Sequence, residues 1–189
     1  MRLVVGITGA SGAIFGVRIL EALKSLSVEI HLIMSRWSRA TIMHETGYTV
    51  DQVEKLASFV HHDDNQAASI SSGSFKTDGM IVAPCSMKTL AAIRAGYGDT
   101  LICRAADVIL KERRKLVLLA RESPLSEIHL ENMLALTRMG AVVMPPVPAF
   151  YNRPKDIPAM VHHIVGRVLD QFGLDLPGMS RWSGFDPQS

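Results

Sequence analysis

Three glycines recur at every third position near the start of the chain, at Gly6, Gly9 and Gly12. They lie between a short apolar run and an amphipathic segment, where a strand would turn into a helix. Glycine lets other groups approach the backbone closely, and the N–H groups and dipole of a helix start favour a phosphate or another electron-rich group. The turn therefore indicates a nucleotide-type ligand, with a turn that needs glycine only for packing as the alternative.

The spacing of these glycines argues against NAD. Dinucleotide-binding proteins carry Gly-x-Gly-x-x-Gly and an acidic residue after the second strand. Here the spacing is Gly-x-x-Gly-x-x-Gly, and Ser35-Arg36 follows the second apolar run. The pattern favours a mononucleotide, which the Ser35 hydroxyl and the guanidinium groups of Arg36 and Arg39 would contact, unless these arginines are only solvated.

A second group of donors follows the third apolar run. Ser86, Lys88 and Thr89 place two hydroxyls and an ammonium at a strand-to-helix turn, with the backbone amides of the new helix beside them. Such a turn would form a second anion cradle next to the first.

The acidic and histidine residues indicate no metal site. Glu45 is a candidate proton acceptor if it faces the ligand, and a surface carboxylate otherwise. The pairs His61-His62 and His162-His163 lack the spacing of zinc ligands. Asp63-Asp64 is not followed by a further aspartate at the spacing typical of magnesium-dependent prenyl-diphosphate enzymes. We expect no bound metal.

Alternating strands and helices position these residues. Because parallel strands need right-handed crossovers, the pattern predicts a doubly wound parallel α/β sheet, Rossmann-like or flavodoxin-like, in three α/β/α layers. Ligands of such sheets bind beyond the carboxyl ends of the strands. The expected strands are Leu3–Thr8, Glu29–Met34, Met80–Pro84, Leu116–Ala120 and Ala141–Met144, and the expected helices are Ala13–Leu26, Val50–Phe59, Lys88–Arg94, Ala105–Arg114, Glu127–Met139 and Ile157–Phe172.

Length and composition narrow the class of protein. With 189 residues, 48% hydrophobic and 20% charged, we expect one folded domain over residues 1–189. A net charge of +2 is too small to indicate nucleic-acid binding. No stretch approaches the roughly 18 apolar residues of a membrane span, and no secretory leader is evident. Cys85 and Cys103 lie far apart, so we expect reduced thiols and a cytoplasmic protein.

Several longer motifs stand in fixed order over nearly the whole chain. They are Gly9-Ala10-Ser11-Gly12, Ser69-Ile70-Ser71-Ser72-Gly73-Ser74, Pro84-Cys85-Ser86-Met87-Lys88-Thr89, Arg104-Ala105-Ala106-Asp107-Val108, Leu110-Lys111-Glu112-Arg113, Arg121-Glu122-Ser123-Pro124, Ile128-His129-Leu130-Glu131-Asn132-Met133 and Pro145-Pro146-Val147-Pro148-Ala149-Phe150-Tyr151. Together they resemble the UbiX-type flavin prenyltransferases. The similarity is closest to the branch whose members accompany a UbiD-type enzyme in phenolic-acid (hydroxyarylic acid) decarboxylase systems.

The resemblance implies a flavodoxin-like, FMN-binding fold that assembles into a dodecamer. It implies transfer of the dimethylallyl group of dimethylallyl phosphate to reduced FMN, first at N5 and then at C6, without a metal. The product, prenylated FMN, would serve a UbiD-type aromatic acid decarboxylase as cofactor.

The resemblance also assigns roles to residues. Ser11 and Glu45 match positions near flavin N5, and Glu122 is a proton donor to the departing phosphate or an organiser of the cations around it. The residues that match FMN contacts are Gly9, Ala10, Ser11, Ser35, Ser86, Met87, Lys88, Thr89 and Arg121. Those that match the substrate-phosphate cluster are Arg104, Lys111, Tyr151 and Arg167.

Each assignment has a structural alternative. Arg104, Asp107, Lys111 and Arg114 recur at helical steps, so they also fit an exposed face of ion pairs, which assembly would have to bring to a neighbour's pocket. Arg121 fits an ion pair with Glu122, Tyr151 a packed aromatic, and Arg167 a solvated side chain.

Two other functions compete with prenyl transfer. A related cysteine decarboxylase would use FMN oxidatively, but its Pro-Ala-Ser-Ala-Asn-Thr turn is replaced here by the segment 84–89. A non-catalytic FMN-binding component of a decarboxylase would leave the phosphate cluster without a purpose.

Overall fold

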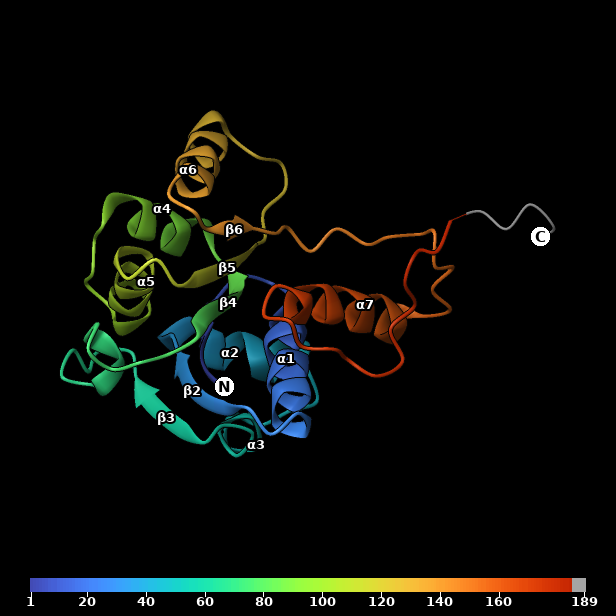
Figure 1. The fold of residues 1–189 in the computed structure, drawn as a ribbon, viewed down its shortest axis with the longest axis horizontal. Coiled ribbons are helices and arrows are strands. Elements are labelled where there is room, and N and C mark those ends of the chain that lie inside the picture. The colour runs from blue at the N-terminus through green and yellow to red at the C-terminus, as the bar shows by residue number, and fades with distance from the viewer. Residues whose placement is uncertain (185–189) are drawn as a thin grey trace.

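The computed structural model describes residues 1–184, so the last five residues of the domain expected over 1–189 lie outside the described part. Six strands alternate with seven α-helices and one 3₁₀ turn (Figure 1). The strands are β1 (Arg2–Ile7), β2 (Glu29–Met34), β3 (Phe59–His62), β4 (Gly79–Cys85), β5 (Lys115–Ala120) and β6 (Val142–Val143). The helices are α1 (Ala13–Ser25), α2 (Arg36–Glu45), α3 (Val50–Glu54), α4 (Met87–Ala95), α5 (Leu101–Lys111), α6 (Glu127–Arg138) and α7 (Ile157–Asp170), with the 3₁₀ turn at Ser69–Ser71.

The strands form one parallel sheet in the order β3-β2-β1-β4-β5-β6. This is the doubly wound order: β2 and β3 are added on one side of β1, and β4, β5 and β6 on the other, so the strand order reverses between β1 and β4. Helices cover both faces, so the predicted three-layer α/β/α fold is confirmed (Figure 1). The reversal places the ends of β1 and β4 side by side, at the edge where a ligand is expected.

Two apolar cores hold the layers together. Along β1, Leu3, Val5 and Ile7 pack with α1 and α7 on one face, while Val4 points to the core beneath α4 and α5. Strands buried on both faces need continuous apolar runs, and β1 and β4 have them, while the run of β2 is interrupted by the buried His31. The central sheet is thus a rigid base for the loops at its carboxyl edge.

Thr8 ties the exits of β1 and β4 together. Its side chain is 1% exposed, and its hydroxyl donates to the carbonyl of Pro84 at 2.7 Å. The same oxygen accepts from the N–H of Ser86 at 2.9 Å. The two turns that the sequence singles out are therefore held in fixed positions relative to each other.

The helix predicted over Val50–Phe59 begins at Val50 as expected, but its predicted end at Phe59 was wrong. Helix α3 ends at Glu54, and Phe59 begins β3, an edge strand that pairs with β2. This strand is mostly exposed, so it lacks the apolar run of a central strand.

Other boundaries also differ from the prediction. Helix α2 was not predicted because only Ser38 and Ile42 in it are buried, and α5 begins at Leu101 rather than Ala105 because Thr100 caps it. The last strand is shorter than expected, and covers only Val142–Val143.

Candidate functional site

A cavity of about 470 Å³ opens at the carboxyl edge of the sheet, beside the reversal between β1 and β4. Its walls come from the ends of β1, β2 and β4 and from the starts of three helices, α2, α4 and α5. Among the predicted FMN residues, it is lined by Gly9, Ser35, Ser86, Lys88 and Thr89. The structure therefore brings together donors from three turns that are well separated in the sequence, those after β1, β2 and β4.

Two of the three helix starts at this cavity offer unpaired donors. Ser35 caps α2 by accepting from the N–H of Ser38 at 3.2 Å, and Ser86 caps α4 by accepting from the N–H of Thr89 at 3.3 Å. Within residues 1–184, the first two N–H groups of each helix have no hydrogen-bond partner. Together with the ammonium of Lys88, they form a site suited to a phosphate.

The third helix start, that of α5, is already occupied. The main-chain oxygen of Asp63 accepts from the N–H of Leu101 at 2.6 Å, and its carboxylate accepts from the N–H of Ile102 at 3.0 Å. Sequence reasoning missed this residue. The only signal in the sequence is the pair Asp63-Asp64, and its spacing gives no sign of a contact with a distant helix.

The glycine turn before α1 also differs from the expectation of free N–H groups. Glu45 Oε2 accepts from the N–H of Gly12 at 2.8 Å and from the N–H of Ala13 at 3.0 Å. The end of α2 thus supplies a carboxylate to the positive end of α1. The negative group at this turn is therefore the carboxylate of Glu45, and the unpaired N–H groups of α2 and α4 are the better donors for a ligand phosphate.

Two other predicted site residues, Ser11 and Arg121, act on the carboxyl group of Glu45. Burial raises the pKa of this carboxyl, but the N–H groups of Ala13 and Gly12, the Ser11 hydroxyl and the charge of Arg121 together hold it below its ordinary value. Arg121 reaches this place because its N–H donates to the carbonyl of Cys85 at 3.1 Å, at the end of β5. Ser11, Glu45 and Arg121 therefore form one charged, hydrogen-bonded cluster next to the cavity.

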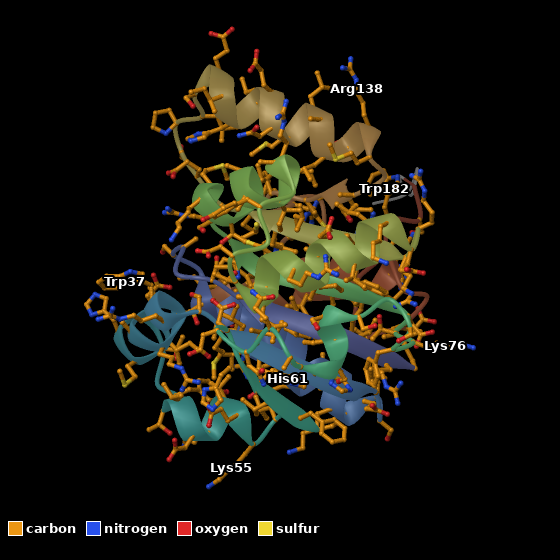
Figure 2. All side chains as sticks on the ribbon, turned by 90° about the vertical axis from the view of Figure 1, so that its left-hand side faces the viewer. Trp37, Lys55, His61, Lys76, Arg138 and Trp182 are labelled. Atoms are coloured by element: carbon orange, nitrogen blue, oxygen red, sulfur yellow. The ribbon has the colours of Figure 1, made fainter. Side chains whose placement is uncertain are left out.

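The geometry of the cavity fits a flavin mononucleotide. Its volume is within the range of small-ligand sites. A Cβ at Gly9 would lie 2.5 Å from the Cβ of Trp37, so glycine is needed there for α2 to approach the turn. Figure 2 shows Trp37 projecting from the molecule, and its side chain is 71% exposed at the rim of the cavity. Met87, by contrast, is buried in the core, so it can contribute only its backbone N–H to the site.

Tyr151 and Arg167 share a different cavity, of about 570 Å³. The Tyr151 hydroxyl is 3.0 Å from Nε2 of His163, and burial lowers the pKa of that imidazole. Nη1 of Arg167 donates to Asp170 at 2.9 Å. Tyr151 is half exposed, so it is not simply a packed aromatic residue. Arg167 forms an ion pair with Asp170, so it is not simply a solvated side chain.

The remaining members of the predicted phosphate cluster do not join this pair. Arg104 and Lys111 lie on α5, where Nη1 of Arg104 donates to Asp107 at 2.9 Å and Lys111 pairs with Glu112 at 2.6 Å. This is in part the exposed ion-pair face that helical spacing offered as the alternative. Glu122 follows β5 and accepts from the N–H of Ser123 at 3.0 Å, with no ion pair to Arg121 among the described residues. The four cationic and phenolic residues do not converge within one chain.

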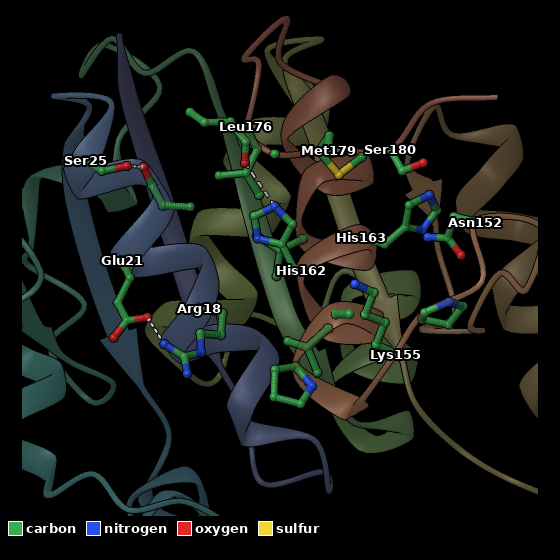
Figure 3. Close-up of a pocket in the computed structure, with 18 of the residues that line it drawn as sticks. Arg18, Glu21, Ser25, Asn152, Lys155, His162, His163, Leu176, Met179 and Ser180 are labelled. Atoms are coloured by element: carbon green, nitrogen blue, oxygen red, sulfur yellow. Dashed lines mark hydrogen bonds and ion pairs between the residues drawn. The ribbon is translucent and has the colours of Figure 1, made fainter. Parts of the chain in front are cut away.

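A larger cavity, of about 760 Å³, lies between α1, α7 and the segments 152–155 and 176–180 (Figure 3). None of the predicted site residues lines it, although His163 borders both this cavity and that of Tyr151.

The described residues form neither a metal cluster nor a membrane-spanning helix. In the part of the chain that the structure describes, no three histidine, cysteine or carboxylate side chains cluster to hold a metal. No helix among the described residues is long and apolar enough to span a membrane. Cys85 and Cys103 are free, buried thiols, as expected, and burial raises the pKa of both.

Comparison with known proteins agrees with a flavin site. The family model named Flavoprotein matches residues 1–169. The chain is 63% identical over 188 residues to a probable UbiX-like flavin prenyltransferase of Bacillus subtilis, covering 100% of this chain and 92% of that protein.

Solved structures show the same relation. The dodecameric FMN-dependent UbiX-like decarboxylase of Escherichia coli O157:H7 is 62% identical, with a TM-score of 0.96 over 97% of this chain and 100% of that one. AnUbiX, solved with FMN and dimethylallyl pyrophosphate, is 57% identical, with a TM-score of 0.96 over 98% of each chain. The cysteine decarboxylase TvaF is 17% identical with a TM-score of 0.62, over 77% of this chain and 90% of that one, and so shares the fold alone. The protein belongs to the family of UbiX-like flavin prenyltransferases.

Proposed function

We propose that this protein transfers the dimethylallyl group of dimethylallyl phosphate to N5 and then to C6 of reduced FMN, which yields prenylated FMN. The observation that carries the proposal is the pair of helix starts, α2 and α4, with unpaired N–H groups around one cavity at the reversal of the sheet. Family membership and the relative solved with FMN and dimethylallyl pyrophosphate support the same ligands.

In this proposal the flavin phosphate binds the N–H groups at the starts of α2 and α4, near Ser35, Ser86 and Lys88. The ring system then extends toward Ser11, Glu45 and Arg121. The reduced flavin supplies the electron pair that attacks the allylic carbon. Met87 and Thr89 take part through the first turn of α4, and Gly9 and Ala10 through the close approach of their backbone.

Glu45 is suited to accept the proton released as N5 is alkylated. Its lowered pKa keeps it ionised at neutral pH, which a proton acceptor requires. Both backbone donors bind Oε2, so Oε1 is left without a backbone partner. The backbone contacts that hold Glu45 in place thus leave Oε1, which only side chains such as Ser11 can contact, as the oxygen for the proton.

A neighbouring copy of the chain completes the substrate-phosphate cluster. Allyl transfer from a monophosphate needs cations and hydroxyl donors around the departing phosphate. One chain offers Tyr151 and Arg167 at one place and Arg104 and Lys111 at another. We assign Glu122 to the second group, and we propose a dodecamer that brings the two groups together, as the dodecameric relative suggests.

The finer assignments are also part of the proposal. The product would be delivered to a UbiD-type aromatic acid decarboxylase, in the manner of the branch that serves phenolic-acid decarboxylase systems. We place the reaction in the cytoplasm, although the yeast relative PAD1 is mitochondrial.

The flavin product distinguishes the candidate functions. Purified protein is incubated anaerobically with reduced FMN and dimethylallyl phosphate, and the mass of the extracted flavin is measured by mass spectrometry. A prenyltransferase gives a flavin heavier by one dimethylallyl unit. Unchanged flavin mass would contradict the proposal and leave a non-catalytic flavin-binding protein, whereas oxidative loss of carbon dioxide from a cysteine peptide would show the decarboxylase.

A further inference from the structure

Asp63 places a fixed carboxylate in the wall of the candidate FMN cavity. Its main-chain oxygen binds the N–H of Leu101, and its Oδ1 binds the N–H of Ile102 at 3.0 Å. The Thr100 hydroxyl also contacts it. The next two N–H groups of α5 are also paired: that of Cys103 donates to the Thr100 hydroxyl, and that of Arg104 donates to the Thr100 carbonyl. The carboxylate therefore takes the position that an anionic ligand would take at α5.

The cavity around Asp63 is otherwise built for a negative charge. The starts of α2 and α4 line it with unpaired N–H groups, and Lys88 adds an ammonium. Burial raises the pKa of Asp63, and the charge of Asp64 adds to this, while the Ile102 N–H, Thr100 and Lys88 oppose it. A half-buried carboxylate thus shares one cavity with the site assigned to the flavin phosphate, and the two negative charges repel each other.

We propose that Asp63 weakens the hold of this protein on the flavin phosphate and so speeds the departure of the flavin. The inference rests on the proposed function, because prenylated FMN must leave this site to serve another enzyme. The unpaired N–H groups at the starts of α2 and α4 and the ammonium of Lys88 all attract a phosphate, and Asp63 is the carboxylate that opposes them in the same cavity. The carboxylate of Asp63 lowers that affinity without removing any donor from α2 or α4.

The test compares two ligands and three variants of the full chain. Asp63→Asn removes the charge and keeps an oxygen that can accept from the N–H of Ile102. Asp63→Ser is a second neutral variant, with a shorter polar side chain. Asp64→Asn is the matched control, because Asp64 is exposed and does not line this cavity. The dissociation constants and dissociation rates of FMN and of riboflavin are measured by flavin fluorescence in low salt.

We expect Asp63→Asn to bind FMN about fivefold more tightly than the wild type, mainly through slower dissociation, as removal of a like charge from the same solvent-accessible cavity would produce. Riboflavin has no phosphate, so its affinity should not change, and Asp64→Asn should bind both ligands like the wild type. Added salt should reduce the gain by screening.

Weaker or unchanged FMN binding in both neutral variants would overturn the inference, because a merely structural residue at α5 gives that result. An equal gain for riboflavin would also overturn it. A wild type that does not prefer FMN over riboflavin would instead contradict the placement of the phosphate, and with it the proposed function.

Discussion

Replacement of Glu45 separates its two roles, as a cap of α1 and as a proton acceptor. In Glu45→Gln, the amide oxygen can still accept from Gly12 and Ala13, which the carboxylate binds at 2.8 Å and 3.0 Å. Only the charge facing the helix start is lost. We therefore expect the free energy of unfolding to fall by about 0.5 kcal/mol, given the exposure of this side chain.

Glu45→Ala removes the acceptor as well. Two N–H groups then depend on water, and we expect a loss of about 1.5 kcal/mol, as for an N-cap. For a chain of this size that loss lowers the midpoint of thermal unfolding by about 3–6 °C. Loss of a general base should slow adduct formation by about 100-fold or more in both variants, which is far beyond the effect on folding.

The pH dependence of stability gives an independent check. The folded protein holds the pKa of Glu45 below its ordinary value of 4.5, so the carboxylate stabilises the fold fully above pH 4.5. This contribution is lost as the pH falls through the lowered value. The unfolding midpoints of wild type and Glu45→Gln, followed by circular dichroism, should differ at pH 7 and converge in acid.

Three results would refute this reasoning. Unchanged turnover of Glu45→Gln would remove Glu45 from the mechanism. A midpoint lowered by more than about 10 °C would mean that the lost rate reflects lost structure. A difference in midpoint that stays constant down to pH 3 would show that the charge of Glu45 does not stabilise α1.

Three further outcomes are expected. Mixed oligomers of Lys111→Ala and Arg167→Ala, each inactive alone, should regain a measurable part of the prenylation rate, and no recovery would show that one chain supplies both residues. Dialysis against EDTA should leave the prenylation rate unchanged, and a loss restored by Mg²⁺ would contradict a metal-free reaction. Burial and His31 lower the pKa of His61, whose Nε2 is 2.9 Å from Nδ1 of His31, so the unfolding midpoint should fall as the pH drops below 6.5. Replacement of His61 by Phe should flatten this decline, and an equally steep decline would assign it to other groups.

The elements that could be predicted from the sequence are those whose burial shows in their own residues, as a run of apolar side chains. Strands β1, β2, β4 and β5 are buried on both faces, so each is a largely apolar run that stands out in the sequence, with only His31 as a polar interruption in β2. The edge strand β3 and helix α2 bury few side chains, and nothing local separates them from loops.

The site shows the same limit. Ser35 and Ser86 could be placed at strand exits because each follows a recognisable strand. The structure confirms the predicted helix start at Ser86, whereas the helix that Ser35 caps was not predicted. That Glu45 caps α1 and Asp63 occupies α5 depends on contacts over about thirty to forty residues, which no spacing in the sequence reveals. The separation of Lys111 from Arg167 likewise follows from the layers and not from the motifs.

The most direct test of the account is a crystal structure of the full chain with FMN. We expect the phosphate oxygens to accept from the first N–H groups of α2 and α4, with Glu45 still bound to Gly12 and Ala13. A phosphate seated on the N–H groups of Gly12 and Ala13, with Glu45 displaced, would contradict it.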